Sequence, residues 1–161
     1  MGQYVKLVRL KDSLGERTVK NMPSPSDPVP GFFEQCRPRP VLERIDTLVV
    51  NENEAASFVG VASAGIAGAQ QMATTILGHG PRHVVVTLGS SGAVVASTGS
   101  CIHFPAPAVP VVDTTGAGDV LVGTLAALLA DGLAPDVASS LAVERASASV
   151  SFPGARSGGA I

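Results

Sequence analysis

The pattern of apolar and polar positions becomes regular after residue 43 and predicts strands that alternate with helices. Short apolar runs rich in Val predict buried strands, which are expected at residues 44–51, 83–89, 93–97 and 109–113. Segments with a helical period follow, and we expect helices within residues 53–60, 66–80, 119–132 and 135–150. The strand at 93–97 returns from a glycine turn, so it is expected to run antiparallel to the strand before it. The sequence therefore predicts an α/β fold with a mixed, mostly parallel sheet and helices on both faces.

The first 40 residues follow neither pattern. Residues 1–20 carry five basic and two acidic side chains, and we leave this charged segment unassigned. Residues 21–40 hold six of the twelve prolines of the chain, which predicts an extended loop or linker because proline fixes φ and donates no backbone hydrogen bond. The folded domain is therefore expected at residues 41–161.

Composition excludes several classes of protein. Of the 161 residues, 45% are hydrophobic and 15% charged, which supports a buried core. The net charge is −2 and no lysine occurs after Lys20, so we expect no nucleic-acid partner. No apolar stretch is long enough to span a membrane, and Cys36 and Cys101 have no metal-type spacing. We expect an intracellular, cytoplasmic protein with two free thiols.

The heptapeptide DTTGAGD, residues 113–119, lies between an apolar run and a predicted helix. Its small residues let backbone N–H groups approach a ligand, and the start of a helix favours an anion such as phosphate. Asp119 beside that site could remove a proton from an attacking hydroxyl. The alternative is that Asp119 only caps its helix and Asp113 only ends a strand. The complete heptapeptide between a strand and a helix favours the functional interpretation.

Two further polar clusters follow predicted strands. TLGSSG, residues 87–92, could line a nucleotide with hydroxyls and bare backbone, or could be only a hairpin turn. NENE, residues 51–54, could hold Mg²⁺ through water, or could only cap the start of a helix. No P-loop, GxSxG or HExxH motif occurs. A base, an anion site and a carboxylate near magnesium together suit phosphoryl transfer.

Together, NxxE, TLGxxG and DTTGAGD, in this order, resemble the C-terminal half of the ribokinase-like (PfkB-type) sugar kinases. NMPSP before the first strand and PGARSG near the end add to the likeness, which covers about residues 21–161. The resemblance implies a three-layer α/β sandwich and ATP-dependent phosphorylation of a sugar hydroxyl. NMPSP, TLGSSG and GARSG together point to the members that phosphorylate D-ribose.

The resemblance also implies a role for each matching residue. Asp119 matches the catalytic base, and the anion hole is matched by Gly116, Ala117 and Gly118. The magnesium–phosphate site is matched by Asn51 and Glu54. The ATP-binding turn is matched by Thr87, Gly89, Ser90 and Gly92.

A monovalent cation, usually K⁺, shapes the anion hole in this family. Asp113 and Thr115 match its ligands, and Gly154 belongs to the loop that closes its site. The implied cofactors are ATP, Mg²⁺ and K⁺, and the implied partner is a small sugar.

The glycine-rich sugar site and β-sheet lid of the family have no counterpart before residue 40. We therefore expect a chain truncated at its N-terminus, and a homodimer only where that lid is present. The activity of the chain by itself stays open. Kinases of fructose, adenosine or ketodeoxygluconate remain as alternatives, and so does a non-catalytic nucleotide-binding module.

Overall fold

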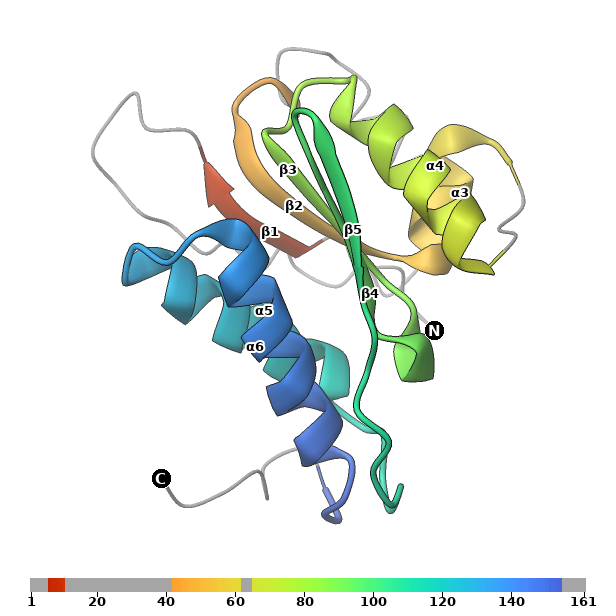
Figure 1. Ribbon diagram of the computed structural model, residues 1–161, viewed down its shortest axis with the longest axis vertical. Coiled ribbons are helices and arrows are strands. Elements are labelled where there is room, and N and C mark those ends of the chain that lie inside the picture. The colour runs from red at the N-terminus through yellow and green to blue at the C-terminus, as the bar shows by residue number, and fades with distance from the viewer. Residues whose placement is uncertain (1–5, 11–41, 62–64, 155–161) are drawn as a thin grey trace, which may run out of the picture.

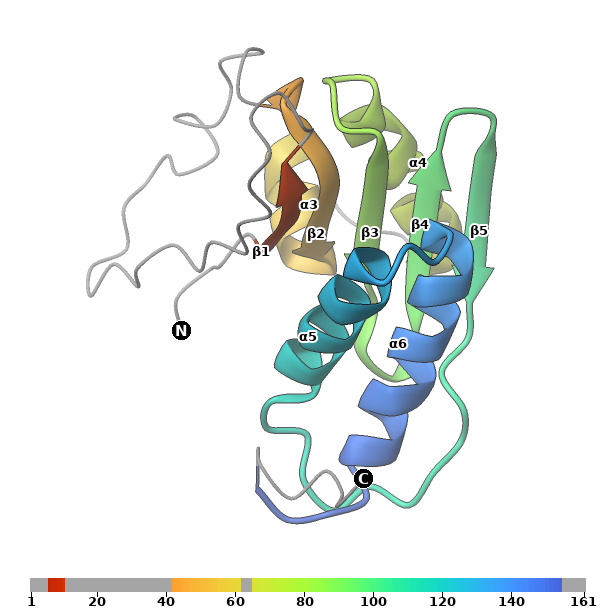
Figure 2. The same cartoon turned by 90° about the vertical axis from the view of Figure 1, so that its left-hand side faces the viewer.

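A computed structural model describes residues 6–10, 42–61 and 65–154, and its centre is a five-stranded sheet. The strands lie in sequence order across the sheet: β1 (Lys6–Leu10), β2 (Ile45–Asn51), β3 (His83–Thr87), β4 (Ala93–Ser97) and β5 (Ser100–Phe104). Figure 2 shows the sheet from the side of α5 and α6. Parallel pairing among the described strands is confined to β2 and β3, where Val49 lies opposite Val85. The other three pairs are antiparallel.

Helices cover both faces of the sheet, as Figure 1 shows. Helices α3 (Glu52–Val59) and α4 (Gly65–Leu77) lie on one face. Helices α5 (Ala117–Ala130) and α6 (Pro135–Ser149) lie on the other face. A short 3₁₀ turn, η1 (Gly89–Ser91), joins β3 to β4. The expected α/β class, with a mixed sheet between two helical layers, is confirmed. The expectation that the sheet is mostly parallel is wrong for the described strands, because hairpin-like pairing makes three of their four pairs antiparallel.

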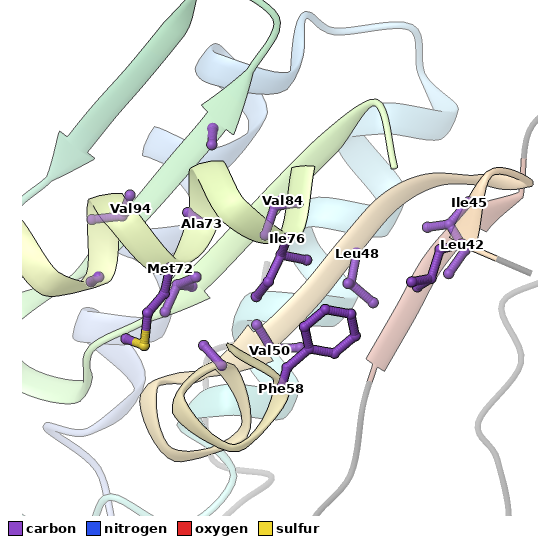
Figure 3. Packing of buried hydrophobic residues seen from close by; sticks show 14 residues of the cluster. Leu42, Ile45, Leu48, Val50, Phe58, Met72, Ala73, Ile76, Val84 and Val94 are labelled. Atoms are coloured by element: carbon purple, nitrogen blue, oxygen red, sulfur yellow. The ribbon is translucent and has the colours of Figure 1, made fainter. Parts of the chain in front are cut away.

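Two hydrophobic clusters fill the spaces between these layers. Because successive side chains of a strand point to opposite faces, Leu48 and Val50 of β2 pack toward α3 and α4, whereas Val49 packs toward α5 and α6. Figure 3 shows Phe58 of α3 and Ile76 of α4 beside Leu48 and Val50. Full burial of an aliphatic or aromatic side chain of this size contributes about 1.5–3 kcal/mol. The Val-rich strands are thus fixed by burial on both faces.

The helix boundaries follow the expected signals. Helix α3 ends at Gly60, which has φ +77 and so provides the left-handed C-cap that a glycine tolerates best. Helix α6 begins with Pro135, whose missing N–H costs nothing in the first turn. Helix α5 begins at Ala117, two residues before the expected start. That shift changes the position of Asp119 within the helix.

The strand expected at residues 109–113 is wrong. This segment has no strand structure, and Val111 and Val112 are 65% and 60% exposed. Pro110 withholds a backbone N–H within the segment, which a central strand would need, and Pro105 and Pro107 precede it. The fifth strand is instead β5, which pairs with β4 across a tight turn at Thr98 and Gly99. Its sequence, SCIHF, lacks the apolar run that marks the buried strands.

The expected linker at residues 21–40 lies outside the described residues. Within the unassigned segment 1–20, residues Lys6–Leu10 form β1 at the edge of the sheet, with two irregularities in its register against β2. None of the helices in the described ranges is long and apolar enough to cross a membrane. Of the two cysteines, Cys36 lies outside the described residues, and Cys101 is a half-buried free thiol.

Candidate active site

The turn that begins at Asp113 is organised around its carboxylate. The N–H of Thr115 donates to Oδ1 at 2.8 Å, and the N–H of Gly154 donates to Oδ2 at 3.0 Å. Hydrogen bonds from the Thr115 hydroxyl and from these two N–H groups lower the pKa of Asp113 from its ordinary value. The group is therefore a carboxylate at neutral pH, and it joins two segments that are 41 residues apart in sequence.

A second set of bonds ties the same two segments together. The carbonyl of Val150, just after α6, accepts the N–H of Val112 at 2.8 Å and the N–H of Asp113 at 3.0 Å. The hydroxyl of Ser151 donates to the carbonyl of Pro110 at 2.8 Å. With the Gly154 bond, these contacts form what we call the 110/154 clasp, which joins residues 110–113 to residues 150–154. The clasp fixes the chain immediately before the glycine-rich turn.

The start of α5 presents backbone N–H donors. Gly116 is the N-cap residue, with φ +80 and no side-chain cap. The carbonyl of Gly116 accepts the N–H groups of Asp119 and Val120 at 2.9 Å each. Within the described part of the chain, no hydrogen bond is found for the N–H groups of Gly116 and Gly118. These donors, at the positive end of the helix dipole, suit an anion such as a phosphate group.

Asp119 lies in the first turn of α5, and its side chain is exposed. Since Gly116 is the N-cap, Asp119 stands at the third helical position, so it is not the N-cap residue that one alternative supposed. A carboxylate in the first turn still stabilises the helix through the dipole, by about 0.3–1 kcal/mol. The position therefore combines a mild structural role with a side chain that is open to solvent beside the backbone N–H donors.

The TLGSSG segment forms a compact turn between β3 and β4. Leu88 N–H donates to the carbonyl of Gly92 at 2.8 Å, and His103 Nε2 lies 2.7 Å from the carbonyl of Ser91, to which it donates. Gly92 has φ +88, and a Cβ placed there would lie 2.0 Å from the carbonyl oxygen of Phe104. The turn thus requires glycine at this position. Gly89 and Ser90, in contrast, are exposed at its tip.

NENE forms a complete capping box at the start of α3. The Asn51 side chain accepts the N–H of Glu54 at 2.8 Å, and Glu54 Oε2 accepts the N–H of Asn51 at 2.8 Å. Glu54 is only 2% exposed. The capping alternative is therefore realised in this structure. No group of three or more His, Cys, Asp or Glu side chains suited to a metal ion occurs among the residues that the structure describes.

The candidate residues gather at one end of the sheet. Asn51 and Thr87 lie opposite each other at the ends of the parallel strands β2 and β3. Figure 2 shows η1, the start of α5 and the end of α6 at the same, lower end of the molecule. The fold thus brings the three polar clusters to one end of the sheet, which is where ligands bind in open α/β sheets.

Several supporting groups were not anticipated from the sequence. They are the Val150 carbonyl, the Ser151 hydroxyl and the His103 imidazole. A backbone carbonyl has no sequence signal, and His103 lies on the strand that was missed. Of PGARSG, the described residues include only Pro153 and Gly154.

Comparison with protein families gives a match to a family model described as "pfkB family carbohydrate kinase" over residues 5–160. Among curated proteins, the chain is 45% identical to a ribokinase of Mus musculus over 82 residues, which is 50% of this chain and 25% of the relative. It is 48% identical to a fructokinase of Klebsiella pneumoniae over 67 residues, 41% of this chain and 22% of the relative. The chain thus spans only about a quarter of the length of these relatives.

Solved structures give the same picture. A ribokinase of Arabidopsis thaliana in complex with ribose and ATP has a TM-score of 0.66 and 32% identity, covering 73% of this chain and 38% of that one. A phosphofructokinase-2 of Escherichia coli in complex with potassium has a TM-score of 0.65 and 28% identity, covering 70% of this chain and 37% of that one. The fold described above is therefore similar to about two fifths of each of these enzymes.

Proposed function

Because this chain belongs to the pfkB family of carbohydrate kinases, we propose that it forms the nucleotide-binding and phosphoryl-transfer part of an ATP-dependent sugar kinase. The observation that carries the proposal is the start of α5, where the N–H groups of Gly116 and Gly118, which have no partner among the described residues, lie beside the exposed carboxylate of Asp119. The N–H groups, with Ala117 between them, would bind the transferring phosphoryl group. The carboxylate would take the proton of the sugar hydroxyl that attacks the phosphoryl group.

In the proposed reaction, Asp119 takes the proton of the sugar hydroxyl, and the hydroxyl oxygen of the sugar forms a bond to the terminal phosphorus of ATP. The bond from that phosphorus to the bridging oxygen breaks, and ADP leaves. Charge on the phosphoryl oxygens is stabilised by the N–H groups and by the dipole of α5. Such preorganised donors are worth most where charge develops in the transition state.

The nucleotide would lie between this turn and the TLGSSG turn. Thr87 ends β3, and Gly89 and Ser90 expose bare backbone and a hydroxyl at the tip. The Gly92 carbonyl and the His103 ring hold that tip in place. An ordered turn of small residues allows a ligand to approach the backbone closely, which supports this position for ATP or ADP.

Mg²⁺ would be held here mostly by phosphate and water, because this ion usually binds few protein carboxylates. Glu54 is buried and already accepts a backbone N–H, so its contribution with Asn51 would pass through water. When bound, the ion would neutralise phosphate charge. The capping box keeps Glu54 beside Asn51 at the end of β2, and Asn51 lies opposite Thr87 on the neighbouring strand.

A monovalent cation such as K⁺ fits the Asp113 turn. Asp113 is ionised, and its two oxygens accept the two N–H groups and the Thr115 hydroxyl, which leaves lone-pair capacity for a cation. Thr115 adds a hydroxyl, whereas Gly154 contributes its N–H to Asp113. We propose that Gly154 holds the carboxylate in position. A bound cation would balance the charge of Asp113 close to the anion site.

D-ribose is our proposed substrate, on the likeness of the TLGSSG and GARSG motifs and the similarity to ribokinases. Fructose and other sugars are the alternatives, since a fructokinase matches the chain as well. A homodimer is proposed only for a form of the protein that carries the family's β-sheet lid. The chain spans a small part of these relatives. A nucleotide-binding module without turnover is the second candidate.

Titration of the ¹⁵N-labelled chain with ADP and Mg²⁺ tests the proposal. We expect amide shifts at residues 87–92 and 116–119 that saturate together with one dissociation constant. Residues 131–134, which lie at the opposite end of α5, serve as the control and should not shift. Shifts confined to other parts of the chain, or none at all, would contradict the proposed nucleotide site.

A further inference from the structure

One bond of the 110/154 clasp is donated by a side-chain hydroxyl, that of Ser151. Its Oγ donates to the carbonyl of Pro110 at 2.8 Å, across 41 residues of sequence. The other bonds of the clasp come from backbone N–H groups or end on the Asp113 carboxylate. Ser151 is therefore the one position among the described residues of the clasp where a side-chain substitution removes a bond without touching Asp113 itself.

The local geometry makes this bond a constraint on the Asp113 turn. Pro110 stands three residues before Asp113 and Ser151 three residues before Gly154, so the bond lies at one end of the clasp and the Gly154–Asp113 bond at the other. The two N–H groups that meet the Val150 carbonyl lie between them. The separation of the two segments is thus set at both ends, and the carboxylate cannot shift without strain in the rest.

Residues 110–113 have little packing to hold them in place. Val111 and Val112 are largely exposed, so little apolar burial holds this part of the loop to the sheet. Pro110 and the residues around it belong to no strand or helix. The position of the Asp113 turn therefore depends on the hydrogen bonds of the clasp rather than on packing.

We propose that Ser151 is a positioning residue for the cation site at Asp113: it sets the affinity of the turn for a monovalent cation without touching the ion. This inference rests on the proposed function, because the cation belongs to that proposal. The Ser151 hydroxyl acts through Pro110 on the backbone that leads to Asp113. Loss of the hydroxyl lets the two segments move apart and weakens the arrangement of oxygens that a cation needs.

The test compares three variants. Ser151→Ala removes the hydroxyl, and Ser151→Thr keeps it. Ser149→Ala is the matched control, since the Ser149 hydroxyl donates to the carbonyl of Ala146 at 2.7 Å, within its own helix end. Each ¹⁵N-labelled chain is titrated with KCl against tetramethylammonium chloride at constant ionic strength. The Thr115 and Gly154 amides, which are the two backbone donors to Asp113, report on the site.

Ser151→Ala should raise the K⁺ concentration that gives half of the shift by roughly three- to tenfold, as the loss of one net hydrogen bond implies. Ser151→Thr and Ser149→Ala should stay within about twofold of the parent chain on the same scale. Ser151→Cys, whose thiol is a weaker donor of similar size, should fall between Ala and Thr, and it keeps the test valid if the Ala variant does not fold.

An unchanged K⁺ midpoint in Ser151→Ala, even with lower thermal stability, would overturn the inference, because a purely structural role predicts that result. A parent chain that responds to ADP and Mg²⁺ at residues 116–119 but not to K⁺ would also overturn it, while the proposed nucleotide site would stand. Absence of both responses would overturn the inference and the proposed function together.

Discussion

Substitution of Gly92 by Ala should damage the TLGSSG turn more than any other single methyl group added there. Gly92 has φ +88 and ψ −130, a conformation that residues with a Cβ rarely adopt. A Cβ there would lie 2.0 Å from the Phe104 carbonyl oxygen and 2.6 Å from the Ala106 nitrogen. Both neighbours are backbone atoms, so the clash cannot be relieved by rotation of a side chain.

The expected loss can be worked out from these two effects. A strained backbone conformation costs about 1–3 kcal/mol, and an added group in a tightly packed place costs about 1–3 kcal/mol more. Gly92→Ala should therefore lower the free energy of unfolding by about 2–6 kcal/mol. Gly89→Ala is the matched control, because Gly89 also has positive φ but meets nothing within 4 Å. Its cost should be only about 1–2 kcal/mol.

Urea unfolding monitored by circular dichroism measures both variants, and ADP titration measures the effect on the turn. We expect Gly92→Ala to lose stability and ADP affinity, with amide shifts that extend to Phe104 and Ala106. If Gly92→Ala proves no less stable than Gly89→Ala, the close approach of β5 to this turn does not constrain it, and the reasoning is refuted.

Three further predictions concern buried and titrating groups. Ser139→Ala should raise the free energy of unfolding by about 1–3 kcal/mol, because the Ser139 hydroxyl is buried and finds no partner among the described residues. Ser147→Ala removes a hydroxyl that donates to the Val143 carbonyl at 2.9 Å, so it should raise this free energy less. Equal increases for both variants in urea unfolding would contradict this. Desolvation lowers the pKa of His83 despite the nearby Asp46 and Asp136, so the unfolded chain binds the proton more readily and stability should fall as pH drops from 7.5 to 5; His83→Gln should flatten that slope in urea unfolding, and an unchanged slope would count against it. The lowered pKa of Asp113 means that its contribution is present above the ordinary pKa of an aspartate and is lost as pH falls through the folded value; the Thr115 and Gly154 amides should report this titration by NMR, and Asp113→Asn should abolish it.

Much of the fold could be predicted from the sequence because β2, β3 and β4 are buried on both faces. Apolar runs such as that of β2, and glycines such as Gly60 after α3, have direct local causes in burial and in backbone conformation. The prediction of a strand at residues 109–113 was wrong because an apolar run alone does not show whether a neighbouring strand is present to pair with it. The prolines around this segment were the better signal.

The candidate site could be outlined from the sequence, whereas the bonds that hold it could not be predicted. DTTGAGD and TLGSSG offer their candidate donors through small residues and backbone, which the sequence displays directly. The bonds that hold these turns come from distant segments, as with Val150 and Asp113 or His103 and Ser91. Such pairings depend on the tertiary fold. The capping box at Asn51 is a local motif, so it could be predicted from the sequence. A role of the same residues in magnesium binding does not follow from that motif.

The most direct test of the account is the turnover of Asp119→Asn in a chimaera that joins residues 42–154 to the complementary part of a ribokinase. Asparagine keeps the size of the side chain but cannot accept the proton, and a general base contributes about 10²–10⁴-fold to a rate. Loss of the charge in the first turn of α5 should cost only about 0.3–1 kcal/mol of stability. The account predicts turnover lowered by at least about a hundredfold, with ATP affinity and thermal unfolding nearly unchanged. Turnover close to that of the parent chimaera would contradict it.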